Sequence, residues 1–594
     1  MRPTLHSLSL AALAAAGSLA FPATLSAQES DPLALVPRDA LVVGWSHGPA
    51  AIEAAFGGTR LAELFGGPEI SSMLQPILDQ ARDEIGAELE KNGVDPVELE
   101  RALLGYRGKI AFAFGMDLPT MIEQEFEAEP ADAGLWAVLA LGADGTTDLD
   151  GFVARVRELV ERENPDGLVD VIVEGRSFPA TEDGDVGITL PFVHDGNAVI
   201  VLGGDLEWAL SKCLFADGDR FADRGVPHLG ATKGVWADVA PWIGGIEGAL
   251  AGLDQSGLAG AMFDAIGIRS LRDLTFTVDP AGEHVAMDLR LRTDGPPTGL
   301  LGAAMRVPNA PPTLLDVLPV QRETWSASRV DFAAGYAGLR ELAAAAEPMT
   351  TQSVDDLEAA FEGKFRVRLK EDLIDQLGDE MIQVVAGAAA RDEEADAQLF
   401  GQCFGLALRD GARFGESFEK MLRSQGLHAA RKSDDYRGTT VHRLGLAAMF
   451  ELHYAITDRL ALFALDEAGS GELRAVLDEI ADRAAGRPRA DLPEAVAERL
   501  EQAPADWHSI SVNSVAQMFR MLAMVAGDSD DPGPFIYDMF GDDADAESGP
   551  ERGETGQFEQ IAAMAEQLAR RYGLDTMVQV SRSGADEAHV RVIW

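Results

Sequence analysis

Cysteine is almost absent from this sequence, which contains 2 Cys, Cys213 and Cys403, among 594 residues. So few cysteines exclude a disulfide framework and any cysteine-rich metal module. The chain is also poor in bases, with 49 Lys+Arg against 98 Asp+Glu and a net charge of −49. Because nucleic-acid binding requires bases that neutralise phosphates, this balance argues against it, and against an anionic membrane surface as partner. Hydrophobic residues make up 46% of the chain, which excludes global disorder and predicts a large, soluble, acidic protein of several domains.

Long apolar runs are missing beyond the N-terminus, so no membrane-spanning helix is expected in the mature chain. The N-terminus itself has the features of a secretory signal. Arg2 is the only charge before Glu29, an apolar stretch runs from Leu8 to Phe21, and Ala27 offers a small residue for cleavage. These features predict a signal peptide over residues 1–27 and a periplasmic or extracellular location. The alternative is an uncleaved anchor helix.

Internal similarity is the strongest pattern in the sequence. Four segments begin with a short predicted strand containing tryptophan and continue into a helix rich in Ala, Gly and Leu, around Trp45, Trp236, Trp325 and Trp507. The first matches the third at an offset of 280 residues, and the second matches the fourth at an offset of 271. Offsets this consistent predict two tandem copies of one long unit.

A cluster of prolines between Asp294 and Val320 marks the predicted join of the two copies, which we place near Pro312. The expected boundaries are 28–312 for the first copy, divided into parts A (28–228) and B (229–312), and 313–594 for the second, divided into parts A (313–500) and B (501–594). Part B of the second copy includes the acidic segment 527–557, which predicts a solvated surface loop.

Within each copy, predicted strands and helices mix without strict alternation. The segment 274–292 alternates with period 2 and predicts a hairpin, with Leu274, Phe276 and Val278 on one face and Thr, Asp and Arg on the other. We expect the polar face to be solvated, and a sheet that is wet on one side is usually antiparallel. The predicted fold class is α+β: two tandem homologous copies, each with antiparallel sheets and helices packed on one face.

The segment DLIDQLGDEMIQVVAG, in which Leu377-Gly378 precedes a strand, resembles a family of bacterial secreted proteins of unknown function. Such proteins are often repeated and are common in planctomycete-like genomes. The first copy departs from the pattern with LLGYRGKIAFAFG. The resemblance implies a location in the cell envelope and brings no catalytic residues with it.

One motif points to catalysis. The residues from Gly44 to Gly48 read GWSHG and match G-x-S-x-G between a predicted strand and helix, the setting of an α/β-hydrolase nucleophile elbow. The motif lies too early in the chain for the strands that normally precede an elbow, and its counterpart Trp325-Ser326 lacks the glycines. We therefore interpret Trp45 as a core anchor. A serine hydrolase using Ser46 stays as an alternative.

The 10 His show no metal-binding spacing. His442 and His453 fall on neighbouring predicted strands and are interpreted as ordinary sheet residues. The acidic runs 144–150 and 542–547 miss the calcium-loop pattern, because Leu149 and Ser548 stand where glycine is required.

The two cysteines occupy non-equivalent positions in the two copies, so buried thiols are expected and a disulfide is not. The sequence thus predicts no catalytic, cofactor-binding or metal-binding residue. It predicts a secreted or periplasmic, non-catalytic binding or structural protein of the cell envelope, whose partner is an envelope protein or ligand. A second alternative is a carrier of an apolar ligand or lipid, because sheets covered by apolar helices such as Gly244 to Phe263 would enclose a cavity. The oligomeric state stays open.

Overall fold

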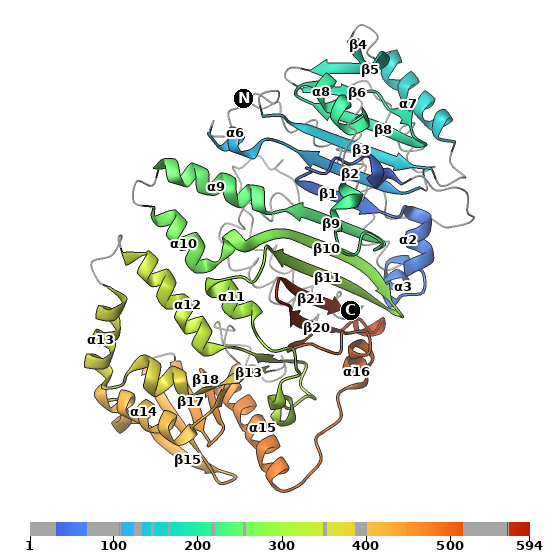
Figure 1. Cartoon of the computed structure of the whole chain (residues 1–594). Helices are drawn as coiled ribbons and strands as arrows, with labels where there is room; N and C mark the ends of the chain where they lie inside the picture. Colours follow the sequence, from blue (N-terminus) through green and yellow to red (C-terminus); the bar gives the residue numbers. More distant parts are fainter. Residues whose placement is uncertain are drawn as a thin grey trace, which may run out of the picture. The chain divides into compact units, whose positions relative to one another are not determined.

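The chain forms two units that are each built on an antiparallel sheet (Figure 1). The computed structural model describes residues 31–67, 106, 108–123, 133–143, 148–163, 167–183, 186–215, 220–253, 257–347, 353–386, 401–447, 450–514, 567 and 569–594. The predicted signal peptide 1–27 and the acidic segment 527–557 lie outside these residues. The first unit contains Met1–Gly260 and Ile268–Asp294, and the second contains Ala261–Gly267 and Gly295–Trp594.

In the described part of the first unit, seven antiparallel strands pair in the order β8-β3-β2-β1-β9-β10-β11. These strands are β1 (Val42–Ser46), β2 (Ile110–Gly115), β3 (Trp136–Gly142), β8 (Asn197–Gly203), β9 (Lys233–Asp238), β10 (Leu271–Ala281) and β11 (His284–Thr293). Smaller strands continue from β8, namely β4 (Leu168–Val173), β5 (Arg176–Asp183), β6 (Val186–Thr189) and β7 (Phe192–His194). The predicted hairpin is therefore present as β10 and β11.

Helices of the first unit pack on the sheet and at the ends of its strands. Their bounds are η2 (Pro32–Leu35), α2 (Pro49–Phe56), α3 (Arg60–Gly66), α6 (Leu118–Glu123), α7 (Leu149–Glu163), α8 (Leu206–Leu210), η3 (Ser211–Phe215), η4 (Phe221–Arg224), α9 (Ala240–Leu253) and η5 (Ile268–Ser270). In Figure 1, α9 lies at one end of strands β9 and β10, and α2 and α3 lie toward the other end. Helix α10 (Leu258–Ile266) runs from the first unit into the second.

One face of the first sheet carries the main apolar core of the unit. Strand alternation places Trp45, Trp136 and Trp236 on this face, with 6%, 1% and 1% of their surfaces exposed. Side chains of η2, α8, η3 and η4, among them Leu210 and Phe221, complete the cluster. The expectation that Trp45 is a core anchor is confirmed.

Two of these tryptophans stand opposite glycines in the strand register. Trp45 pairs with Gly234 on β9, and Trp136 pairs with Gly115 on β2. A Cβ atom at Gly234 would lie 2.1 Å from the Trp45 ring, and one at Gly115 would lie 2.6 Å from the Trp136 ring. The large ring thus fills the space that the missing side chain leaves.

The polar face of the β10–β11 hairpin is buried, so the expectation that it is solvated was wrong. Asp273, Thr275 and Thr277 are each 1% exposed, whereas the apolar Phe276 and Leu289 are 37% and 40% exposed. Burial is tolerated because the charges are paired: Arg292 donates to both carboxylate oxygens of Asp273, at 2.7 and 2.6 Å. Two such charge-assisted bonds offset the cost of removing both groups from water.

In the described part of the second unit, seven antiparallel strands pair in the order β18-β14-β13-β12-β19-β20-β21. These strands are β12 (Thr324–Arg329), β13 (Leu377–Val385), β14 (Gln402–Leu408), β18 (Leu460–Ala464), β19 (Ser509–Ser514), β20 (Thr576–Ser583) and β21 (Glu587–Ile593). The sheet continues from β18 through β17 (Phe450–Ile456), β16 (Thr439–Ala447) and β15 (Lys432–Tyr436). Trp325 lies within β12, but Trp507 lies two residues before β19, so the expectation that all four tryptophans stand within strands was wrong for Trp507.

Helices cover both faces of the outer part of this second sheet. Their bounds are α11 (Gly299–Met305), η6 (Thr313–Val317), α12 (Phe332–Ala345), α13 (Val354–Phe365), η8 (Leu369–Leu373), η9 (Ile374–Gln376), α14 (Gly411–Ser424), η11 (Leu427–Ala430), α15 (Glu467–Ala484) and α16 (Glu494–Leu500). The apolar residues Leu473, Val476 and Leu477, which share one face of α15, are buried against one face of the sheet. Phe414 and Phe418 of α14 pack on a separate cluster that contains Tyr454.

The change from the first unit to the second falls between Asp294 and Gly295, and the predicted boundary near Pro312 lies inside the second unit. The packing of α11 explains the difference, because Leu300 lies against Gly338 of α12, where a Cβ would be 3.0 Å away. The proline cluster therefore belongs to the second unit. Helices together with antiparallel sheets confirm the α+β class. Within the described residues, no helix has both the length and the apolar character needed to cross a bilayer.

We predict that Gly234→Ala destabilises the protein by about 1 to 3 kcal/mol, because the new methyl group would collide with the Trp45 ring. Gly44→Ala is the matched control on the neighbouring strand, since a Cβ there would lie 4.0 Å from its nearest neighbour. Urea unfolding monitored by tryptophan fluorescence measures both. Equal midpoints for the two variants would contradict the proposed contact.

We also predict that Asp273→Ala lowers the free energy of unfolding by about 3 kcal/mol, because it removes the buried carboxylate that pairs with Arg292, whose side chain is only 16% exposed. Glu283→Ala is the control: this carboxylate pairs with Arg60 at 3.2 Å but is 71% exposed. An exposed pair contributes less than about 1 kcal/mol. Equilibrium denaturation of the two variants should therefore differ clearly, and similar losses would contradict the role given to burial.

Candidate functional site

Ser46 ends strand β1, and a turn leads from it to helix α2, as the GWSHG motif predicts. The surroundings differ from those of a nucleophile elbow, because β1 lies between two antiparallel strands, β2 and β9. The Ser46 hydroxyl accepts a long bond of 3.4 Å from the backbone N–H of Gly48. This geometry gives no support to the hydrolase alternative.

Both cysteines are buried and unpaired, as expected. They belong to different units, Cys213 to η3 and Cys403 to β14. Burial raises the pKa of each thiol to about 12, which keeps both protonated at neutral pH. Protonated buried thiols are poor nucleophiles and poor metal ligands.

His442 and His453 do lie on neighbouring strands, β16 and β17, but their side chains point to opposite faces. The register pairs His442 with Tyr454 and Arg443 with His453. His442 Nδ1 shares a hydrogen bond of 2.8 Å with the Ser433 hydroxyl, so it is an ordinary sheet residue. His453 is not, because it faces two carboxylates.

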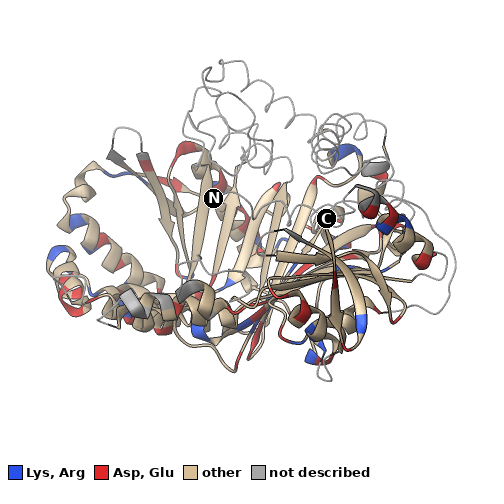
Figure 2. Ribbon diagram, turned by 90° about the horizontal axis from the view of Figure 1, so that it is seen from above, with Lys and Arg blue, Asp and Glu red and all other residues tan. Residues whose placement is uncertain are grey.

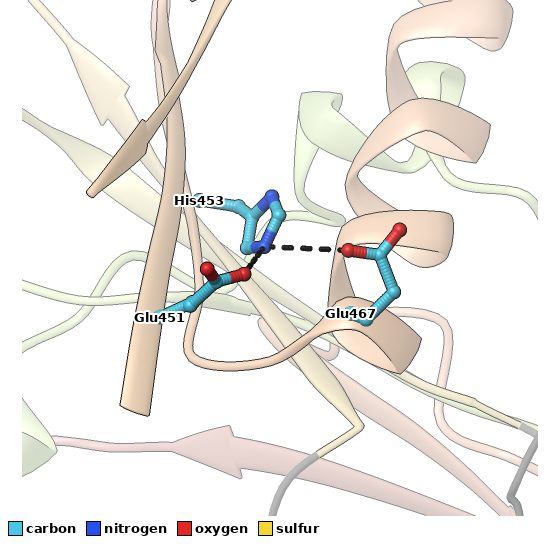
Figure 3. Close-up of side chains that lie close together, drawn as sticks. All are labelled: Glu451, His453 and Glu467. Atoms are coloured by element: carbon cyan, nitrogen blue, oxygen red, sulfur yellow. Dashed lines mark ion pairs between the residues drawn. The ribbon is translucent and has the colours of Figure 1, made fainter. Parts of the chain in front are cut away.

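The structure brings Glu451, His453 and Glu467 together in the second unit (Figure 3). Glu451 and His453 are two residues apart on β17 and therefore share a face. Glu467 is the first residue of α15, which the N-cap Asp466 begins by accepting a bond from the N–H of Gly469. His453 Nε2 lies 3.5 Å from Oε2 of Glu451 and 3.7 Å from Oε2 of Glu467.

The histidine is the buried member of this cluster. Its side chain is 4% exposed, whereas Glu451 is 37% and Glu467 is 72% exposed. Arg443 donates to Oε2 of Glu451 at 2.6 Å, and this bond lowers the pKa of that carboxyl. One imidazole nitrogen and two carboxylate oxygens form a donor set that suits a divalent transition-metal ion.

The sequence analysis did not identify this cluster, although the spacing of two of its three residues could be recognised. Within β17, which reads FELHYAI, Glu451 and His453 stand at the i, i+2 spacing that shares a face. Glu467 comes 14 residues after His453, beyond the turn into β18 and that strand. Of the acidic runs singled out from the sequence, only residues 148–150 lie in the described part of the chain, and there Asp148 accepts a bond of 2.9 Å from the Gly151 N–H at the start of α7. Residues 144–147 and 542–547 lie outside the described residues.

A second feature lies on the other face of the first sheet, opposite the tryptophan core. Two neighbouring rows of paired residues cross all seven strands, and every member is glycine, alanine or a larger apolar residue. We call these fourteen residues the apolar face: Ile200, Leu139, Phe112, Gly44, Val235, Phe276 and Leu289 in one row, and Leu202, Ala137, Phe114, Val42, Ala237, Leu274 and Leu291 in the other. All of them are at least partly exposed.

The apolar face is most open on strands β9 to β11. Val235, Phe276 and Leu289 are adjacent in one row and are 46%, 37% and 40% exposed. Figure 2 shows long stretches of strand without charged residues, while red and blue gather on helices and strand ends. Contiguous exposed apolar surface of this kind marks binding sites in soluble proteins.

Lys233 borders the apolar face. It precedes Val235 by two residues on β9, so both side chains share a face, and it pairs in register with Ser46 on β1 and Val278 on β10. Burial lowers the pKa of its amine, because the surroundings penalise the charged form. Among the described residues, Lys233 has no ion-pair partner.

No protein-family model matches this chain. No curated protein matches it. Two solved structures, crystal forms IV and I of TP0453, align with 11% and 9% sequence identity over 44% and 45% of this chain and 80% and 79% of theirs. Their TM-scores are 0.20 and 0.21, which is too low to establish a common fold.

Proposed function

We propose that this protein is an exported, non-catalytic binding protein whose first unit holds an amphiphile with an apolar chain and an anionic head group. The observation that carries the proposal is the apolar face, two complete rows of apolar residues that stay partly open across seven strands. Exposing such a surface without a ligand is unfavourable, because apolar area in contact with water costs free energy. A bound apolar chain would remove that cost.

The charges of the protein indicate which kind of molecule would bind to the apolar face. The net charge of −49 repels an anionic bilayer, which disfavours docking of this face on such a membrane. Lys233 offers a single cation beside the apolar rows, and the Ser46 hydroxyl is its cross-strand neighbour. A carboxylate head group at Lys233, with the chain laid over Val235 and Phe276, satisfies both features.

The test is displacement of a fluorescent fatty acid by saturated carboxylates of increasing length. Each buried CH₂ contributes up to about 0.8 kcal/mol, so affinity should rise with chain length. Phe276→Ser should weaken binding at least tenfold, whereas Met577→Ser, on β20 of the second unit, should leave it unchanged. Lys233→Met should weaken carboxylates but not alcohols of equal length. Absent binding, or equal loss in both serine variants, would refute the proposal.

Export is the second part of the proposal. The support is the N-terminal sequence, with one charge before Glu29, an apolar stretch and a small residue at position 27. The resemblance to secreted bacterial repeat proteins agrees with this location. N-terminal sequencing of protein from the periplasm or medium should begin at Gln28, and an intact Met1 on purely cytoplasmic protein would contradict export.

We further propose that the two units are tandem copies. Two independent features support this: the sequence offsets, and the order of the main strands. In each unit the first strand of the sheet lies in the middle, with the next three main strands on one side and the last three on the other. An experimental structure with a different strand order in either unit would contradict the duplication.

A further inference from the structure

We propose that Glu451, His453 and Glu467 form a binding site for one divalent transition-metal ion, with Zn²⁺ as the reference case. The site lies in the second unit and is independent of the proposed ligand on the first. Each residue offers one ligand atom, and these three atoms all lie within 4.8 Å of one another. Figure 3 shows the three side chains pointing toward a common point between the strand and the helix.

The buried histidine points to a ligand. Nε2 of His453 is shielded from solvent and has no hydrogen-bond partner, while the two carboxylates stand just beyond hydrogen-bonding distance. Leaving a buried polar atom unsatisfied costs about 1 to 3 kcal/mol. A metal ion between the nitrogen and the two oxygens satisfies all three atoms at once.

The separations also fit an ion. Two ligand atoms that each lie about 2.1 Å from zinc at a tetrahedral angle are about 3.4 Å apart. The observed separations from Nε2 are 3.5 and 3.7 Å, so small side-chain rotations bring the atoms into place. Exposure of Glu467 leaves further coordination positions open to water.

The donor types define the class of ion. A nitrogen and two carboxylate oxygens suit Zn²⁺, Mn²⁺, Fe²⁺ or Co²⁺, whereas Ca²⁺ prefers oxygen ligands alone and Cu⁺ prefers sulfur. Arg443 pairs in register with His453, and its Nε lies 2.6 Å from Oε2 of Glu451, the oxygen that also lies nearest the histidine. Its bond to the carboxylate orients Glu451 in the way that groups around a metal ligand commonly do.

Titration of the chelator-treated full-length protein with Co²⁺, followed by visible absorption, tests the site. One ion per chain is expected, with Zn²⁺ displacing it. His453→Gln and Glu467→Gln should each weaken binding at least tenfold. His442→Gln is the matched control, because this histidine lies on the neighbouring strand, on the other face, and should leave affinity unchanged.

Glu467 is 72% exposed, so its substitution tests the site without a risk to folding. The urea midpoint of each variant identifies any loss that comes from unfolding. If the wild type binds Co²⁺ no better than the His453→Gln, Glu467→Gln double variant, the three residues are an ion-pair cluster and the proposal is wrong. A double variant that is ten times weaker or more supports the proposal, even if other carboxylates still bind Co²⁺ weakly.

Discussion

Strand register is the constraint on which the rest of the structure depends. In a sheet, a slip of one residue moves every side chain to the opposite face. The Trp45–Gly234 and Trp136–Gly115 pairs oppose such a slip, because each ring fits only where a neighbouring strand has no side chain. The same register that buries the tryptophans puts Val235, Phe276 and Leu289 on the other face, in one row. The core and the apolar face are therefore two results of one set of strand pairings.

The local pattern predicted much of this architecture, because alternation and helical stripes depend on residues close in sequence. The β10–β11 hairpin and the buried stripe of α15 follow directly from periodicity. Periodicity does not show which face of the hairpin is buried, since this depends on pairing between distant residues such as Asp273 and Arg292. Alternation separates polar from apolar residues in the same way whether the polar or the apolar face is buried. The expectation that polar residues are solvated failed here, and the Asp273–Arg292 pair is the interaction that offsets part of the cost of burying them.

The candidate metal centre, too, could be predicted from the sequence only in part. A strand with Glu451 and His453 on one face could be predicted, and a carboxylate at the start of a helix is common because of the helix dipole. Glu467 lies close to the same histidine because β17 pairs with β18 and a turn leads from β18 into α15. Searches for close sequence spacing find helical or loop sites, in which the ligands are local. A site shared by a strand and a distant helix start has no such signature.

The partners of the bases give a further indication, because several partly buried cations of this acidic chain contact a carboxylate. Arg224 contacts Asp238, Arg292 contacts Asp273, and Arg329 contacts Glu380. Lys233 departs from this pattern, since it is half-buried beside the apolar face and the described residues give it no carboxylate. Acidic residues are abundant in this chain, so a carboxylate partner for Lys233 at the border of the apolar face would require only one substitution. Among the residues that the structure describes, Lys233 is thus left beside an open apolar surface without a carboxylate, and this placement suits the anionic head group that we propose.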